Sequence, residues 1–150
     1  MKINENFHIL MTPWRLSLLW AFMLFNMIFR DIHDLFIPAF FEEIGTGVIN
    51  GNTITAEVLL VGSMMIELPV SMVILSVLLP KRYSRITNLV VAALFIPMLL
   101  MTGIRDLDDY FFIAVKVTAA IAIFYTAWRW PAASIPTTQT TATATTAAMR

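Results

Sequence analysis

One acidic residue, Glu67, stands near the middle of a 23-residue stretch, Val58 to Pro80, that carries no other charge. An apolar stretch of this length is typical of a membrane-spanning helix. A carboxylate deep in a bilayer is costly unless it is paired or faces a polar cavity. The stretch therefore predicts an integral membrane protein in which Glu67 is the first candidate functional residue.

Three further segments are apolar enough to be spans. The first is charge-free from Leu16 to Phe29, only 14 residues, so it must continue to about Ile37, where Pro38 ends it. The others are Ile86–Ile104 and Tyr110–Trp128, each of 19 residues. The chain is 59% hydrophobic and 13% charged, whereas a soluble domain is about 25% charged. We expect an all-α, four-span transmembrane helix bundle over residues 14–130, with spans at about 14–37, 58–80, 86–104 and 110–128.

The segments outside the spans differ in composition. Residues 1–13 read as a cytoplasmic N-terminal segment, and the Thr/Ala-rich tail 131–150 as disordered. The first external loop predicts a short interfacial helix, which Gly45 and Gly47 then break. Thr55 is placed to cap the second span. The loop's apolar residues at helix-like spacing are Phe40, Phe41, Ile44, Val48 and Ile49.

Basic residues are distributed unevenly between the two sides of this bundle. The N-terminus, the 80–85 turn and the tail hold seven of them, whereas the opposite side holds two, beside eight acids. Cytoplasmic loops are enriched in Lys and Arg. We therefore expect both termini in the cytoplasm and a place in the bacterial inner (plasma) membrane. The seven are Lys2, Arg15, Lys81, Arg82, Arg85, Arg129 and Arg150.

Several function classes find no support in the sequence. The net charge is zero, so we expect no nucleic-acid partner. The chain has no cysteine and no nucleophile-elbow, zinc-protease or phosphate-loop motif, so no cofactor is expected. His8 and His33 would lie on opposite sides of the membrane, so we expect no metal site.

A polar pocket in the outer half of the bundle is the main site hypothesis. Ser63, Glu67 and Ser71 are spaced i, i+4, i+8 along one helix stripe. Lys116 is the other lone intramembrane charge, at a similar depth, which predicts an ion pair with Glu67. Asn26 completes the lining. Two alternatives are a purely structural Glu67 and a Lys116 that reaches outward to Asp108 or Asp109.

A second polar cluster lies at the end of the first span. Arg30 is spaced to meet Asp34 at i+4, and Asp31 and His33 stand beside them. A solvated or headgroup-level helix end is the favoured interpretation of this cluster.

From Arg15 to Trp130 the chain resembles a family of small four-helix bacterial membrane proteins whose function is itself unknown. The resemblance rests on three stretches. They are Arg15-Leu-Ser-Leu-Leu-Trp20 followed by Asn26 and Asp31, Met65-Ile-Glu-Leu-Pro-Val-Ser-Met-Val-Ile-Leu-Ser76, and Tyr125-Thr-Ala-Trp-Arg-Trp130. The resemblance implies a four-span bundle and directs attention to Asn26, Asp31 and Glu67, but it implies no activity.

The expected function is non-enzymatic binding or passage of a small molecule through the polar pocket. One alternative is an enzyme that uses Glu67 as acid and base on a lipophilic substrate, which would need a second titratable group nearby. The other is a structural subunit of a membrane complex. The expected partners are the lipid bilayer and either further copies of the chain or another membrane protein, because no internal repeat of the transporter kind is apparent.

Overall fold

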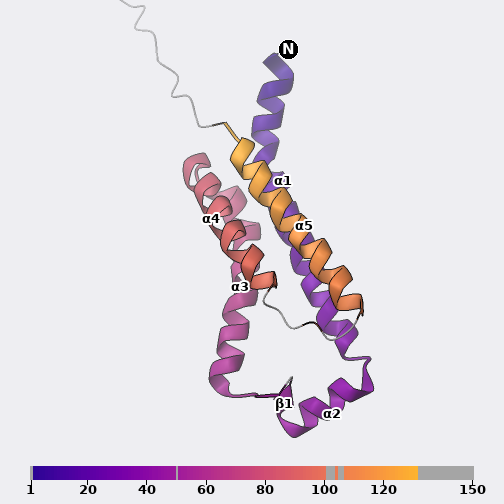
Figure 1. Cartoon of the computed structure of the whole chain (residues 1–150). Coiled ribbons are helices and arrows are strands. Elements are labelled where there is room, and N and C mark those ends of the chain that lie inside the picture. The colour runs from indigo at the N-terminus through magenta and orange to yellow at the C-terminus, as the bar shows by residue number, and fades with distance from the viewer. Residues whose placement is uncertain (1, 50, 101–103, 105–106, 132–150) are drawn as a thin grey trace, which may run out of the picture.

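A computed structural model of the chain describes residues 2–49, 51–100, 104 and 107–131, and for residues 2–9 the backbone alone. Four of its helices are long and apolar enough to cross a membrane, so the predicted four-span bundle is confirmed. Figure 1 shows these helices side by side. The elements in order are α1 (Lys2–Asp34), α2 (Pro38–Thr46), β1 (Val48–Ile49), β2 (Asn52–Thr53), α3 (Ala56–Leu78), α4 (Lys81–Leu100) and α5 (Leu107–Arg129).

The first helix differs from its predicted span at both ends. It begins at Lys2, so the backbone of the predicted N-terminal segment is continuous with the span, and Pro13 lies inside the helix. It ends at Asp34 rather than near Ile37. Pro38 does not end this helix but begins the next one, where the missing backbone N–H has no helical partner to lose.

The external loop contains the predicted short helix and a hairpin that was not predicted. Helix α2 ends at Thr46 and is capped by Gly47, whose positive φ of 72° favours glycine. Val48 and Ile49 pair as an antiparallel strand with β2 instead of extending the helix. Thr55 caps α3 as expected, its hydroxyl accepting the Val58 N–H at 3.4 Å. The tail beyond Pro131 lies outside the described residues.

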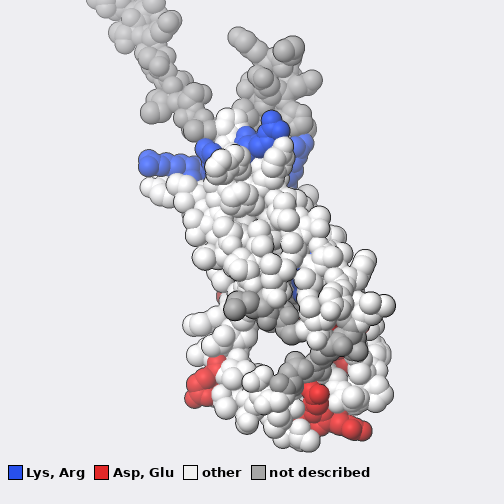
Figure 2. Space-filling model, in the orientation of Figure 1, with Lys and Arg blue, Asp and Glu red and all other residues white. Residues whose placement is uncertain are grey.

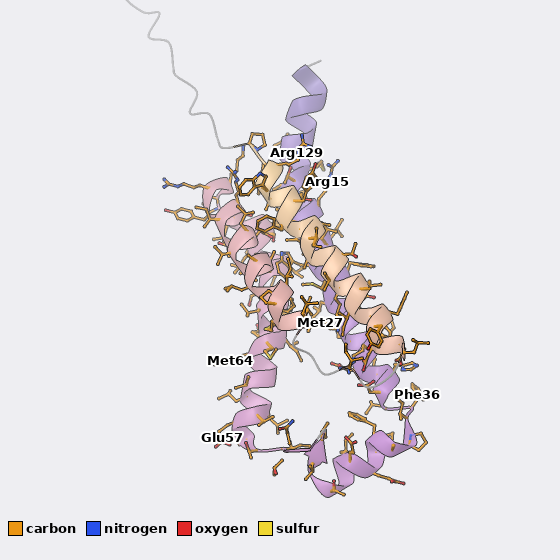
Figure 3. All side chains as sticks on the ribbon, viewed as in Figure 1. Arg15, Met27, Phe36, Glu57, Met64 and Arg129 are labelled. Carbon is orange, nitrogen blue, oxygen red and sulfur yellow. The ribbon has the colours of Figure 1, made fainter. Side chains whose placement is uncertain are left out.

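The bundle is packed unevenly along its length. Helix α1 lies between α3 and α5, and α4 packs on α5 and more lightly on α3. Trp20 and Phe95 meet edge to face at the centre of the core, with ring centroids 6.0 Å apart. Helix α3 buries only Pro69, Met72 and Ser76, all in its second half. Its first half, which carries Glu57 and Met64, stands apart from α1 and α5 (Figure 3).

Charge separates the two ends of the molecule. In Figure 2, Lys and Arg gather at the end where the described chain stops, and Asp and Glu gather at the opposite end. We call the first, with Arg15, Lys81, Arg82, Arg85 and Arg129, the basic end. The second, the acidic end, holds Asp31, Asp34, Glu42, Glu43, Glu57, Asp108 and Asp109.

Candidate functional site: a charged cluster between α1 and α5

The acid at the centre of α3 lies on the outside of the bundle. Glu67 is exposed, and it precedes the buried Pro69 by two residues. Two residues correspond to about 200° around a helix, so Glu67 lies on the face opposite the core. Its carboxylate accepts a hydrogen bond from Ser71 at 3.5 Å. Ser63, also exposed, donates to the Leu59 carbonyl of its own helix at 2.9 Å.

The structure does not contain the predicted ion pair between Glu67 and Lys116. Lys116 is buried in α5, with 4% of its surface exposed. The charged groups close enough to act on it are Arg30, Asp31, Asp109 and Asp34, all on α1 or α5. The two residues lie on different helices: Glu67 is exposed on α3, whereas Lys116 is buried on α5. The alternative, in which Lys116 turns toward the acids at the start of α5, agrees better with this placement.

Asn26 also lies apart from the predicted pocket. Its side-chain amide donates to the Phe22 carbonyl one turn earlier in α1, at 2.8 Å. Of the five residues predicted to line one pocket, the structure brings together only Glu67 and Ser71. Whether any of the five holds a ligand stays a prediction.

Arg30 is the centre of an ion-pair cluster at the acidic end. Its Nε donates to Asp109 Oδ1 at 2.9 Å, which joins α1 to α5. Within α1 its Nη2 lies 3.5 Å from Asp34, so the predicted i+4 pair is confirmed, and its Nη1 lies 3.8 Å from Asp31. Asp34 and Asp109 are buried, whereas the Asp31 side chain is 59% exposed. The cluster therefore has a buried interior and one carboxylate open to its surroundings.

A second contact joins the same two helices. His33 Nδ1 lies 3.1 Å from Asp108 Oδ2, and both side chains are partly exposed. Its ring also lies against Phe112, with centroids 6.4 Å apart. Within the described ranges, no three His, Asp or Glu side chains converge as metal ligands. These contacts make a polar, ion-paired junction between α1 and α5.

Lys116 extends this junction toward the middle of the bilayer. It follows Asp109 by seven residues, two helix turns, so both lie on one face of α5. Among the described residues its ammonium group has no hydrogen bond and no ion pair within 4 Å. The junction thus offers an exposed carboxylate on Asp31 and, on the largely buried Lys116, N–H donors without a direct partner in the described chain.

A family comparison identifies the chain at the level of its sequence. Residues 1–137 match a family of unknown function, DUF6326. The chain belongs to this family. The match confirms the predicted resemblance to an uncharacterised family. No curated protein and no solved structure matches the chain.

This DUF6326 chain also contains a neutral polar network that the sequence analysis missed. Asn88 Oδ1 accepts from Trp20 Nε1 at 2.7 Å and from Ser76 Oγ at 3.1 Å, while its Nδ2 donates to the Ser84 carbonyl at 2.8 Å. All four residues are buried. Asn88, a polar amide inside a predicted span, is the signal in the sequence that points to this network.

Two stretches quoted for the family resemblance meet at this network. Trp20 ends the first stretch and Ser76 ends the second. Ser17, also in the first, donates to the Val73 carbonyl in the second at 2.7 Å. These stretches therefore hold α1, α3 and α4 together, which is a structural role and not evidence of ligand binding.

An apolar groove runs along the surface beside the ionic junction. It has a volume of about 390 Å³ and is lined by Leu19 and Phe22 of α1 and by Phe111, Ala114, Val115 and Thr118 of α5, among others. Thr118 uses its hydroxyl within its own helix, bonding the Ala114 carbonyl at 2.7 Å. None of the predicted site residues lines this groove, and its lining matches the acyl region of a bilayer.

Proposed function

We propose that the protein is a non-enzymatic membrane protein that binds a small polar molecule at the acidic end, between α1 and α5. The site residues are Lys116, Arg30, Asp31, Asp34 and Asp109. This proposal keeps the expected kind of function but moves the site away from Glu67. Whether binding leads to passage across the membrane is a further step for which the geometry offers no path.

One observation carries the proposal: Lys116 is a buried residue, with 4% of its surface exposed, and its ammonium group has no hydrogen bond or ion pair within 4 Å among the described residues. Burying a charge away from water is costly, and an opposite charge compensates only when the geometry is close. The three neighbouring aspartates act on Lys116 at a distance, and two of them already bind Arg30 closely. A bound acceptor group, from a ligand or from water held for it, would satisfy the free N–H donors.

The neighbouring charges suggest what such a ligand carries. An acceptor group, for example a carboxylate or a carbonyl, suits Lys116. A positive charge or a hydrogen-bond donor suits Asp31, whose side chain is 59% exposed. A small zwitterionic molecule combines both, and it would enter from the acidic end.

The charge asymmetry supports an orientation for the site. Five described basic residues lie at the basic end, which favours a cytoplasmic position for that end and for both termini. In the inner membrane of a bacterium the ligand site would then face outward. An impermeant thiol reagent applied to intact cells should label Ile44→Cys, at the acidic end, but not Arg82→Cys, at the basic end.

Native mass spectrometry of the detergent-purified protein tests the binding. The wild-type protein should carry a small-molecule adduct of one defined mass. Lys116→Met should lose it, whereas the control Arg82→Met, which removes an exposed basic residue at the other end, should keep it. Retention of the same adduct by Lys116→Met would contradict the proposal, as would a wild-type protein that carries none.

The two alternatives receive less support from the contacts. In the described part of the chain Ser71 is the side chain that hydrogen-bonds Glu67, so no second titratable group is in place for acid and base chemistry there. A structural subunit would explain the ion pairs of Arg30 equally well. It does not explain why an unpartnered lysine is buried beside them.

A further inference from the structure

Glu67 occupies the middle of its helix and also the middle of the membrane. Helix α3 has 23 residues from Ala56 to Leu78, and Glu67 is the twelfth of them. It lies about 16 Å along the helix from either end, and the hydrocarbon core of a bilayer is about 30 Å thick. Since its side chain points away from the core of the bundle, it faces whatever surrounds the protein at the midplane. Its hydrogen bond from Ser71 is long, at 3.5 Å, and an acid in lipid is costly without close partners, so this position favours a further hydrogen-bonding partner.

The residues around Glu67 form a regular seam along α3. Counting from Leu60, the seam residues are separated alternately by four and three positions, the heptad spacing of two packed helices. The four apolar members are each more than half exposed, so the described chain leaves most of their surface uncovered. The seam comprises Leu60, Met64, Glu67, Ser71, Ile74 and Leu78.

Helix α3 is also the span that the bundle covers least. Only 11% of its apolar window is buried, against 28% for α4 and α5. Exposed apolar residues are ordinary on a helix that faces lipid. The seam differs because a carboxyl and a hydroxyl, Glu67 and Ser71, interrupt it at its centre. A polar residue in an apolar heptad specifies register and partner number.

We propose that the seam of α3 packs against the same seam of a second copy, forming a parallel homodimer around Glu67. All copies have the same distribution of basic residues and therefore insert in the membrane in the same orientation, so their α3 helices run parallel. In a parallel two-fold helix pair the seam residues lie next to the axis, so each of them meets its own counterpart. Glu67 then meets a second Glu67 at the same depth, and one shared proton lets the two carboxyl groups hydrogen-bond each other. Ser71 supplies a further donor to each.

A second copy explains the seam better than a different protein does. The described seam holds no cation to recruit, and its one acid needs a partner at the same depth in a helix of the same tilt. An identical helix supplies that partner with no further requirement. This inference goes beyond the proposed function and does not depend on it, since the seam and the charged cluster at the acidic end share no residue.

Cysteine cross-linking tests the dimer, because the chain contains no cysteine of its own. The variants are Leu60→Cys and Ile74→Cys in the seam and Val61→Cys beside it. The three parent side chains are equally exposed, at 58%, 56% and 57%, so accessibility is matched. Mild oxidation in native membranes should give a dimer band for Leu60→Cys and Ile74→Cys and little for Val61→Cys. Equal bands at all three positions, or none, would overturn the proposal.

The role of Glu67 is tested in the Ile74→Cys background. Glu67→Gln keeps a hydrogen-bonding side chain and should leave the dimer fraction unchanged. Glu67→Leu should lower the dimerisation constant by about threefold or more, the effect of losing one interhelical hydrogen bond. Glu57→Leu makes the same change in the first turn of α3, outside the seam, and should have no effect.

Two results would reassign the seam. If its cysteines cross-linked to a protein of another mass, the occupant would be a different membrane protein and the homodimer would be excluded. If Glu67→Leu left the dimer fraction intact, the carboxyl would have no part in the interface. Native mass spectrometry separates these results from the proposed function, since loss of the dimer with Glu67→Leu predicts no loss of the small-molecule adduct.

Discussion

Two polar clusters hold this helix bundle together, and they are built on opposite principles. The one around Asn88 is neutral and buried, and each of its side chains is hydrogen-bonded across α1, α3 and α4. The one around Arg30 is charged, joins α1 to α5, and reaches from an exposed Asp31 to a buried Lys116 without a direct partner in the described chain. A buried network whose hydrogen bonds are all made fixes the packing of helices. A network with an unpartnered charged group carries an unfavourable free energy, and such costs are typical of binding sites.

The neutral cluster should show the largest loss of stability when it is broken. Asn88→Leu leaves Trp20 Nε1 without an acceptor and the Ser84 carbonyl without this donor. The free energy of unfolding should fall by about 3 kcal/mol, since each buried group left unsatisfied costs about 1–3 kcal/mol. Unfolding by a denaturing detergent, followed by tryptophan fluorescence, measures the loss.

Thr87→Val is the matched control for this change. Thr87 is the next residue in α4, and its hydroxyl bonds the Tyr83 carbonyl within the same helix at 2.8 Å. Its replacement should cost less than about 0.5 kcal/mol. If Asn88→Leu cost as little as the control, the neutral cluster would not stabilise the bundle, and the two clusters would not differ in this respect.

At the closest contact of the charged cluster, between Arg30 and Asp109, the coupling energy of the pair should be smaller than this loss of stability. A double-mutant cycle with Arg30→Gln and Asp109→Asn should give a coupling of about 1.5–2 kcal/mol, the lower part of the range for hydrogen bonds to charged groups. Arg129 and Tyr125 make a control pair at the basic end, exposed and 2.7 Å apart. Their coupling should lie within the error of the measurement, because an exposed pair is solvated and screened by salt. Equal couplings at the two ends would mean that burial adds nothing at the Arg30 contact.

The sequence predicted depth along the membrane well and direction around each helix poorly. Hydropathy and charge locate the four spans because each span must match the thickness of the bilayer. Which way each side chain points depends on the packing of α3 and α5, and the apolar residues of a lipid-facing surface look like those of a core. The predicted pair failed for this reason.

Local contacts were predictable, and contacts across the bundle were not. The Arg30–Asp34 pair and the Thr55 cap follow from spacing within a few residues, and both are present. The Arg30–Asp109 contact joins residues 79 positions apart, and the sequence contains no signal that selects Asp109 over its neighbours. Asn88 was overlooked because the candidate sites were chosen around charged side chains, and an amide carries no charge.

Replacing Lys116 should give the smallest effect on stability. The result decides whether the charged cluster is a binding site or a structural contact. In a cluster built only for stability, removing a buried cation would leave uncompensated acids and cost about 3–5 kcal/mol. A lysine retained for a ligand contributes nothing to the unliganded fold, so Lys116→Met should change the free energy of unfolding by less than about 0.5 kcal/mol or raise it. Ile123→Ala, in the same helix, shows that the assay responds to a core defect, with an expected loss of about 2–5 kcal/mol.

A large loss for Lys116→Met would place Lys116 among the structural contacts of Arg30 and remove the reason for proposing a ligand there. An unchanged stability together with loss of the small-molecule adduct would separate the two clusters by role, because the same substitution would then remove binding without weakening the bundle.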